Sequence, residues 1–463
     1  MPYKINYHKG VTMMKSIKLK CKVITPMFMA GADGKTPELR PSEFKGMMRF
    51  WWRAIRGDDD IEKLREEEAE IFGGTGEEQG KSKVIIKVYP KPSNQFLGEK
   101  LKEDFGLEWR YSRNINSLEG RDAGIGYLLY STVLPHKEKK YIKANFQFNI
   151  ELSSYDEESF KNALSSLWAS IYLGGFGTRA RRGAGNTVVE QVEGDIFGID
   201  FIHKGESAED LGKWLKDNLE KCSKFINSNK LKNFCTKYSN LSFSRIIISN
   251  QSFTDWKTAL NDIGKIYAGF RTKHKSEIFD TAVFGLPVMH RNKTKVESKF
   301  SERRGSPLLI KIFQLNKNFY WAILRLTGEF LQENNPLALK KKINDKWEIE
   351  KTQKPDYKLI DEFWNDLKNS GKEFVLSQPE ILNNIIEKIK TECNPDKVIL
   401  FGSRARGDAH KNADIDIAIE NPKNPISSID ISAPLDIVDL TKANSSLKDK
   451  IKREGVTIYE RKS

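Results

Sequence analysis

Cysteine and histidine are scarce in this chain, at four and six of its 463 residues. The cysteines are Cys21, Cys222, Cys235 and Cys393. They form no C-x-x-C pair and no cysteine–histidine spacing, so the sequence excludes a zinc finger and a disulfide framework. Unpaired cysteines are typical of a reducing compartment, which favours the cytoplasm.

Long apolar runs are absent as well. Residues 1–15 hold no continuous apolar region, and no later segment approaches the length of a membrane span. A signal peptide and a transmembrane helix both require such a run. We therefore expect a cytoplasmic protein with no membrane partner.

Acidic residues are in the minority. Lysine and arginine number 77 against 63 aspartates and glutamates, which gives a formal net charge of +14. Such an excess favours a polyanionic partner, and nucleic acid is favoured over a membrane surface. The chain is too long for one compact core, so we expect about two to four domains.

Glycine and arginine, in contrast, gather in residues 174–186 (GGFGTRARRGAGN), with five glycines and three arginines. Glycine lets a partner approach the backbone, and the arginine fork fits phosphate oxygens, so this stretch suggests an RNA-phosphate cradle. The alternative is a mobile surface loop. Its position between an amphipathic helix and a strand favours the cradle. The residues assigned to it are Gly174, Gly175, Gly177, Arg179, Arg181 and Arg182.

Hydrophobic periodicity predicts alternating strands and helices around this stretch. The predicted strands are 16–24, 83–89, 142–152 and 187–192, and the predicted helices begin at Pro41, Glu62 and Phe160. Residues 91–140 look irregular and are interpreted as a long insertion that orders against a partner. The order βαββαβ is that of a ferredoxin-like domain, which recurs among RNA-binding folds.

The helix that begins at Pro41 carries a row of basic residues opposite its apolar face. Lys45, Arg49 and Arg53 lie four residues apart, so they could follow a phosphate backbone or simply be solvated. Trp51 and Trp52 are neighbours, and we expect one to be in the core and the other at a subunit or RNA surface.

Residues 195–370 partly repeat the pattern. Strands are predicted at 241–249, 308–313 and 320–326, and a helix at 256–270, which suggests a second ferredoxin-like domain. Basic clusters occur at residues 271–275 and 303–306 and are read as RNA contacts or solvated charge. His274 and His290 are interpreted as structural.

Five motifs in order resemble the family of the first RAMP subunit of the Cmr (type III-B) CRISPR effector. They lie within about residues 15–335, at Leu39–Ser42 with Arg49–Ala54, Gly73–Gly74, Gly174–Gly185, Phe284–Pro287 and Arg303–Pro307. The resemblance implies two ferredoxin-like (RRM-like) RAMP domains and a non-catalytic subunit in antiviral defence. It also implies binding of guide RNA and target RNA near the 3′ end of the guide, with other RAMP subunits as partners.

From this resemblance and the charge pattern we assign a set of RNA-binding residues outside the cradle. They are Arg40, Lys45, Arg49, Arg53, Arg303 and Arg304.

The last ninety or so residues are chemically different. A helix at 381–389 and a strand at 398–401 lead into the turn Gly402–Gly407, and Asp414 and Asp416 follow. Side chains two apart in a strand point to the same side, so these aspartates can share divalent metal. Asp436 is the preferred third carboxylate and Asp439 the alternative.

This region resembles the minimal nucleotidyltransferases of the polymerase-β superfamily, through the Gly-Ser turn, the Asp-x-Asp pair and the terminal strand from Glu454–Gly455 to Tyr459. The resemblance implies Mg²⁺ held by Asp414, Asp416 and Asp436. It further implies a nucleoside triphosphate (NTP) substrate bound by Gly402, Ser403 and Arg404 or Arg406, with in-line attack on its α-phosphate.

The predicted fold class is α+β, with three domains at 15–194, 195–370 and 375–463. The sequence favours an RNA-binding architectural subunit of a CRISPR ribonucleoprotein with a nucleotidyltransferase-like appendix. The competing hypothesis is a nucleotidyltransferase whose basic N-terminal domains present an RNA or protein acceptor. The sequence leaves open whether the C-terminal domain is active.

Overall fold

The structure is a computed structural model. It describes residues 13–76, 79–90, 96–112, 114, 117–134, 138–227, 233–290, 294–301, 303–332, 334–426 and 434–461. Within these ranges no helix is long and apolar enough to cross a membrane.

The first sheet is antiparallel throughout and has the strand order β2-β7-β1-β8. Its strands are β1 (Lys15–Val23), β2 (Val84–Pro90), β7 (Gln147–Ser154) and β8 (Thr187–Gly194). Alternate apolar residues place one face in the core, so that Leu19 lies opposite Ile150 on one side and Val192 on the other. The predicted strand 142–152 is interrupted, because Asn145 takes a left-handed conformation (φ 69°).

Helices α1 (Pro41–Arg56) and α5 (Glu157–Tyr172) cover that face, and α6 (Ala208–Asn227) packs beside α5. Asp156 caps α5 by accepting a hydrogen bond from the amide of Ser159. The expectation that only one tryptophan of the pair is in the core is wrong. Both Trp51 and Trp52 are buried, because α1 lies in the layer between the first sheet and the second sheet and is therefore covered on more than one side.

The second sheet has the strand order β12-β13-β9-β16 and is also antiparallel. Its strands are β9 (Asn240–Ser249), β12 (Leu308–Leu315), β13 (Asn318–Thr327) and β16 (Gly371–Ser377). The two sheets have the same topology. If the four strands of each sheet are numbered along the chain, their spatial order is 2-3-1-4 in both. Helices α7 (Trp256–Lys273) and α9 (Lys358–Leu367) pack on the outer face.

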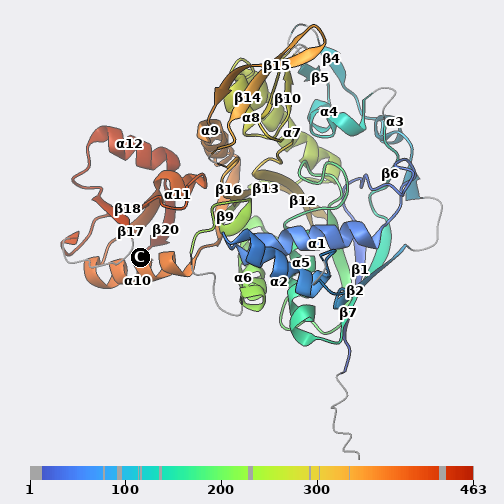
Figure 1. Cartoon of the computed structure of the whole chain (residues 1–463), viewed down its shortest axis with the longest axis horizontal. Coiled ribbons are helices and arrows are strands. Elements are labelled where there is room, and N and C mark those ends of the chain that lie inside the picture. Colours follow the sequence, from blue (N-terminus) through green and yellow to red (C-terminus); the bar gives the residue numbers. More distant parts are fainter. Residues whose placement is uncertain are drawn as a thin grey trace, which may run out of the picture.

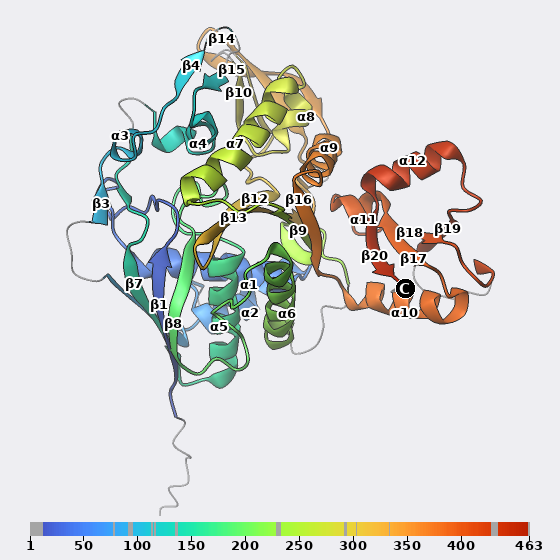
Figure 2. The same ribbon diagram turned by 180° about the vertical axis from the view of Figure 1, so that it is seen from behind.

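The two sheets share one core, in the layer order sheet, helices, sheet, helices (Figures 1 and 2). In β9, Ile246 and Ile248 point to the helices α1, α5 and α6, whereas Ile247 points to α7 and α9. Every residue of β9 is buried, and its apolar run Ile246–Ile248 therefore serves both layers.

Residues 96–142 hold short elements that the sequence did not predict. They are β3 (Leu97–Gly98), α3 (Leu101–Asp104), β4 (Arg110–Ser112), β5 (Ser117–Glu119), α4 (Ala123–Leu128), the 3₁₀ helix η2 (Tyr130–Thr132) and β6 (Tyr141–Ile142). Helix α4 crosses α7 so closely that a Cβ atom on Gly264 would lie 2.4 Å from the carbonyl oxygen of Gly124. The insertion therefore orders against α7, within the chain itself.

A third sheet, β10-β11-β14-β15, lies beyond α7 and was also not predicted. Its members are β10 (Val288–His290), β11 (Thr294–Ser298), β14 (Leu337–Ile343) and β15 (Lys346–Gln353), with α8 (Ile278–Ala282) beside it. Asn344 and Asp345 both have positive φ in the hairpin turn, as a two-residue turn of this kind requires.

The C-terminal region forms a separate lobe beside β9 and β16 (Figures 1 and 2). Its sheet has the order β19-β18-β17-β20, and β18 and β19 run parallel. The helices of this lobe are α10 (Glu380–Cys393), α11 (Gly402–Arg406) and α12 (Ser445–Glu454), and its strands are β17 (Lys397–Phe401), β18 (Ile415–Glu420), β19 (Leu435–Asp439) and β20 (Val456–Glu460). The remaining helix, α2 (Ile61–Phe72), packs beside α1.

Candidate nucleic-acid interface and nucleotide site

A groove of about 1880 Å³ lies between α1, the insertion (residues 100–138) and α7, and we call it the central groove. Three segments that the sequence singled out meet there. They are the glycine–arginine loop (residues 174–182), residues 284–287 and residues 303–306. These segments are far apart in the sequence, so only the tertiary fold places them on one surface.

The glycine–arginine loop is an ordered part of the protein, and the alternative of a mobile surface loop is wrong. The amide of Thr178 donates to the carbonyl of Phe28 (2.8 Å), and that of Gly185 donates to the carbonyl of Pro26 (2.9 Å). Gly177 has φ 83°, and a Cβ atom there would lie 2.6 Å from the Phe28 oxygen. The glycines therefore permit close approach of the chain to itself.

The arginines of the loop reach across to the second sheet. Arg181 Nη1 donates to the carbonyl of Ser306 (2.7 Å), and its guanidinium lies 5.1 Å from the ring centre of Phe50. Arg182 Nη2 donates to the carbonyl of Phe284 (2.7 Å). Both side chains thus join the two halves of the groove, a structural role that the cradle hypothesis did not include.

Arg179 is less committed, because among the described residues its side chain donates to the hydroxyl of Ser131 (2.8 Å from Nε) and to no backbone carbonyl. Burial and the neighbouring Arg182 lower its pKa. Burial, together with Arg304 and Arg182, lowers the pKa of Arg181 to about 10. An anion bound in the groove would relieve this repulsion between neighbouring guanidinium groups.

The two arginines of the second cluster differ. Arg304 Nε donates to the carbonyl of Phe330 (2.6 Å), and Nη2 donates to that of Glu329 (3.1 Å). Arg303 is exposed at the rim of the groove. Of this pair, Arg303 is therefore the residue whose charge is available to a ligand.

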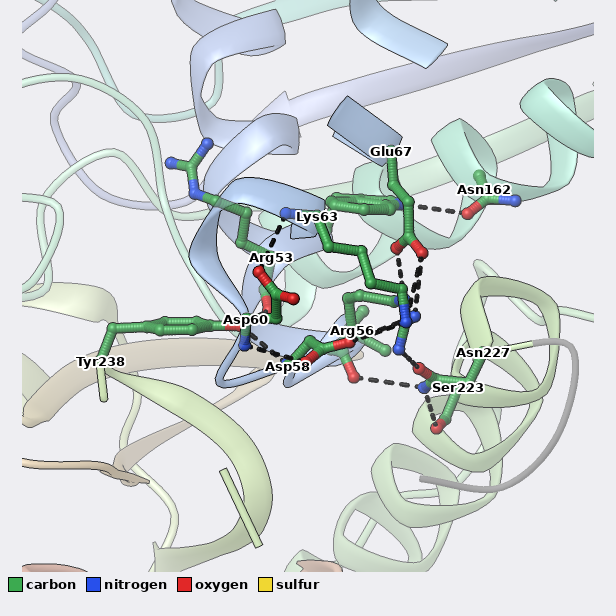
Figure 3. A network of polar contacts seen from close by, with 12 residues as sticks. Arg53, Arg56, Asp58, Asp60, Lys63, Glu67, Asn162, Ser223, Asn227 and Tyr238 are labelled. Carbon is green, nitrogen blue, oxygen red and sulfur yellow. Dashed lines mark hydrogen bonds and ion pairs between the residues drawn. The ribbon is translucent and has the colours of Figure 1, made fainter. Parts of the chain in front are cut away.

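The basic row on α1 does not face the groove. Arg49 Nε pairs with Glu68 Oε1 (2.5 Å) and Arg53 Nη1 pairs with Glu68 Oε2, and Glu68 belongs to α2. One turn on, Arg56 lies between Glu67 and Asn227, as Figure 3 shows. The sequence could not reveal this pairing, because it depends on how α2 folds back on α1.

Helix α1 instead presents Met47 and Phe50 to the groove. Lys45 is half-buried, and burial followed by the adjacent Arg49 lowers its pKa. Arg40 is half-buried at the N-terminus of α1, where its amide donates to Met29 Sδ. Arg40, Lys45, Arg49 and Arg53, which were predicted to bind RNA, are thus not among the residues that line the central groove.

Aromatic residues of the insertion line the opposite wall of the groove, and sequence reasoning missed them. They are Trp109, Tyr111, Tyr127 and Tyr130. Tyr111 and Tyr130 are 57% and 51% exposed. The available signal was the density of aromatic and basic residues in a stretch that lacks regular periodicity.

His274, interpreted as structural, is buried, with Nδ1 2.8 Å from Glu277 Oε1. The side chain of His290 lies outside the described residues.

In the C-terminal lobe, the parallel pairing of β18 and β19 sets Asp416 directly beside Asp436. Gly402, with φ 69°, packs against this carboxylate, and a Cβ atom there would lie 1.9 Å from Asp416 Oδ2. Burial, then Asp436 and Asp414, raise the pKa of Asp416. The three predicted aspartates therefore interact electrostatically next to the Gly-Ser turn.

The carboxylates fit a metal only in part. Oxygen ligands suit Mg²⁺, and Asp416 and Asp436 stand side by side to provide them. Across the part of the chain that the structure describes, however, no three His, Cys, Asp or Glu side chains are gathered closely enough to hold a metal ion. Asp414 lies exposed just before β18. Asp439, the alternative, is bonded to Thr441, whose hydroxyl donates to it (2.7 Å).

The remaining predicted nucleotide ligands divide by role. Ser403 is half-buried at the start of α11. Arg404 is buried, with Nη2 donating to the carbonyls of Ala413 (2.8 Å) and Lys411 (3.1 Å), so it shapes the loop before Asp414. Arg406 pairs with Asp408 and with Glu454. Both arginines are thus occupied within the protein.

Comparison with known proteins agrees with this division of the chain. Residues 20–189 match the RAMP superfamily, and residues 383–463 match the polymerase beta nucleotidyltransferase family. The chain is 35% identical over 185 residues to the CRISPR system Cmr subunit Cmr1-2 of Pyrococcus furiosus, covering 37% of this chain and 93% of that protein.

Two further similarities concern the same group of proteins. The Cmr subunit Cmr1-1 of that organism is 28% identical over 300 residues, covering 62% of this chain and 80% of that protein. The crystal structure of Cmr1 from Pyrococcus furiosus superposes with a TM-score of 0.53 at 20% identity, covering 78% of this chain and 99% of that one. This chain belongs to the Cmr1 family of CRISPR Cmr subunits, a RAMP family, and carries a polymerase beta nucleotidyltransferase domain at its C-terminal end.

Proposed function

We propose that this chain is the RNA-binding Cmr1-type subunit of a type III-B CRISPR ribonucleoprotein, and that guide RNA or guide–target RNA enters the central groove. The family membership supports a place in a Cmr complex with other RAMP subunits, in the cytoplasm. The observation that carries RNA binding is the convergence of the glycine–arginine loop, residues 284–287 and Arg303 on one groove.

The lining of the groove suits RNA better than a protein partner. Positive side chains along the loop and rim attract phosphates, and exposed Tyr111 and Tyr130 offer surfaces on which bases can stack. The excess of positive charge in the whole chain acts in the same direction.

The test uses Arg179→Ala and Arg303→Ala, because these two side chains hold no backbone carbonyl in place. The matched control is Arg65→Ala on α2, an exposed arginine that pairs with Glu62 away from the groove. Each groove variant should weaken single-stranded RNA binding and reduce the salt slope by about 0.7 per lost phosphate contact. If both groove variants keep the wild-type RNA affinity and salt slope, the proposal that RNA binds in the central groove is wrong.

We also propose the domain organisation. Two ferredoxin-like RAMP units, built on the first and second sheets, begin near residues 15 and 195. The second unit includes β16, which pairs with β9 and therefore moves its end from residue 370 to about 377. The nucleotidyltransferase-like domain follows.

A second candidate function is nucleotidyl transfer. It is favoured by the match of residues 383–463 and by Asp416 and Asp436 in register beside Gly402. Asp414, Asp416 and Asp436 would hold Mg²⁺, which when bound neutralises phosphate charge. Gly402 and Ser403 would bind the triphosphate at the start of α11, and Asp416 would keep its carboxylate against that turn.

Incubation of the full chain with each radiolabelled NTP and Mg²⁺, alone and with guide RNA, tests this activity. The comparison is the double variant Asp414→Asn, Asp416→Asn. Label that appears on RNA or protein and disappears in the double variant supports transfer. Label that persists in the variant contradicts the assignment of these aspartates.

A further inference from the structure

Two buried arginines of the second sheet face the C-terminal lobe. Arg245 of β9 and Arg325 of β13 stand directly opposite each other in the antiparallel ladder and are 4% and 2% exposed. Two cations buried side by side are unfavourable unless their partners compensate them. Their partners therefore show what the pair does.

Each arginine bonds to one carboxylate, on β16 or on α9, and to one main-chain carbonyl of α11. Arg245 donates from Nη1 to Glu373 Oε1 (3.0 Å) and from Nη2 to the carbonyl of Ala405 (2.8 Å). Arg325 donates from Nη2 to Asp361 Oδ1 (2.6 Å) and to the carbonyl of Arg406. The carboxylates balance the charge, while the second contact of each arginine crosses to the lobe.

The ring of Trp364 on α9 holds both guanidiniums in place. Its centre lies 5.3 Å from Arg245 and 5.7 Å from Arg325, and its indole nitrogen donates to Glu373 (2.7 Å). Arginines fixed by an aromatic ring and a carboxylate lose little freedom when they bind a third group. The pair is therefore a rigid receptor for the two carbonyls.

The carbonyls in question are those that a helix leaves without partners. The last carbonyls of any helix lack intrahelical donors, and α11 ends at Arg406. The next residue is held as well, because the amide of Gly328 donates to the carbonyl of Gly407 (3.0 Å). Three consecutive residues, 405–407, are thus bound to the second sheet.

The other end of this short helix is the Gly-Ser turn. Gly402 opens α11 and rests against the Asp416 carboxylate. Because α11 has only five residues, contacts that fix its carboxyl end also fix the place of its amino end.

We propose that Arg245 and Arg325 are positioning residues for the nucleotide site: they fix α11 from its carboxyl end and so hold Gly402 and Ser403 against Asp416. The nucleotide site would then be a joint property of the second RAMP sheet and the C-terminal domain. The effect on nucleotide binding rests on the nucleotidyl-transfer function proposed above. The positioning of α11 can be measured without nucleotide.

The variants are chosen to keep the protein folded. Arg245→Met leaves Glu373 paired with Lys368 (2.9 Å) and Trp364. Arg325→Met is combined with Asp361→Leu, because exchange of a buried ion pair for apolar residues is often tolerated. The matched control is Lys340→Met, which removes a cation paired with buried Glu297 in the third sheet, remote from α11.

The first measurement is hydrogen exchange of the full chain without nucleotide. Residues 402–408 should exchange faster in Arg245→Met and in the Arg325→Met, Asp361→Leu variant, and at the wild-type rate in Lys340→Met. Unchanged exchange of these residues in both interface variants overturns the proposal, whatever the nucleotide site does.

The second measurement is the affinity for a fluorescent ATP analogue with Mg²⁺. The Kd should rise by about tenfold in the interface variants, equivalent to one lost charged hydrogen bond, and Arg325→Lys should recover part of it. Faster exchange of 402–408 with undiminished affinity overturns the positioning role. If the wild-type chain binds no nucleotide while exchange responds as expected, the positioning stands and the nucleotidyl-transfer function fails.

Discussion

Lys311 is a buried cation where β12 meets the end of α5. It is 2% exposed, and Nζ donates to the carbonyls of Ile171 (2.6 Å) and Gly174 (2.7 Å), where α5 ends and the glycine–arginine loop begins. Among the residues that the structure describes, no carboxylate pairs with it, and burial lowers its pKa to about 7. The lysine therefore holds the start of the loop through two hydrogen bonds, and its burial favours the neutral amine.

This pKa makes stability depend on pH. The unfolded chain keeps the lysine protonated up to a pKa of about 10.4, so between about pH 7 and pH 10 the unfolded state binds more protons. The free energy of unfolding should then rise with pH through this window, by at most about 1.4 kcal/mol per pH unit. Denaturant unfolding at several pH values, for wild type and Lys311→Met, measures it. Parallel profiles for the two proteins would contradict this prediction.

The arginines of α1 show how the same residue type serves stability in one place and binding in another. Arg49 and Arg53 share the buried carboxylate of Glu68, so Arg49→Ala should destabilise the protein by about 1–3 kcal/mol. RNA affinity and its salt slope should not change. Arg65→Ala on the exposed side of α2 should leave stability within about 0.5 kcal/mol of wild type.

Denaturant unfolding and an RNA titration of the same two variants distinguish the possibilities. A stable Arg49→Ala protein with weakened RNA binding would restore the original assignment of this row to the RNA path.

Helix α7 carries two glycines with opposite requirements. A Cβ atom on Gly264 would meet the backbone of Gly124 in α4, whereas nothing lies within 4 Å of that position on Gly269. The first glycine is thus needed for helix packing, while the second only lowers helix propensity.

Alanine substitution should therefore have opposite effects within one helix. Gly269→Ala should stabilise the protein by about 0.5–1 kcal/mol through helix propensity. Gly264→Ala should destabilise it by about 1–3 kcal/mol, because α4 must move. Thermal unfolding of both variants decides, and equal shifts would mean that the contact of α4 with α7 is wrong.

The molecule as a whole behaves as connected layers more than as separable modules. The domain bounds predicted from the sequence suggest that deletion after Asn369 would leave both RAMP domains intact. It would, however, remove β16 from the second sheet and take Glu373 and α11 away from Arg245 and Arg325. Uncompensated buried cations destabilise strongly.

We therefore expect the fragment 1–369 to be insoluble or unfolded. The full chain should unfold in a single transition through both RAMP sheets and the C-terminal lobe. Solubility and scanning calorimetry test both statements. A soluble fragment with the native circular dichroism of its helices, or a separate transition for the lobe, would show that the parts are independent.

The sequence by itself determined what local pattern and composition can carry. Period-two alternation predicted β1 and much of β7, and the motifs indicated the family and the C-terminal nucleotidyltransferase resemblance. These features depend on neighbours along the chain, so the order of residues is enough to reveal them.

Only the tertiary structure decided which charges are available. Arg49, Arg181 and Arg303 look alike in the sequence, yet one pairs with Glu68, one holds the Ser306 carbonyl and one lies exposed at the groove. The third sheet and the aromatic wall of the insertion were also missed. The two hairpins of that sheet join only where β11 pairs with the distant β14, and in the insertion β3 pairs with the distant β6. A side chain's role follows from the partners that folding brings to it, and those partners lie tens to hundreds of residues away.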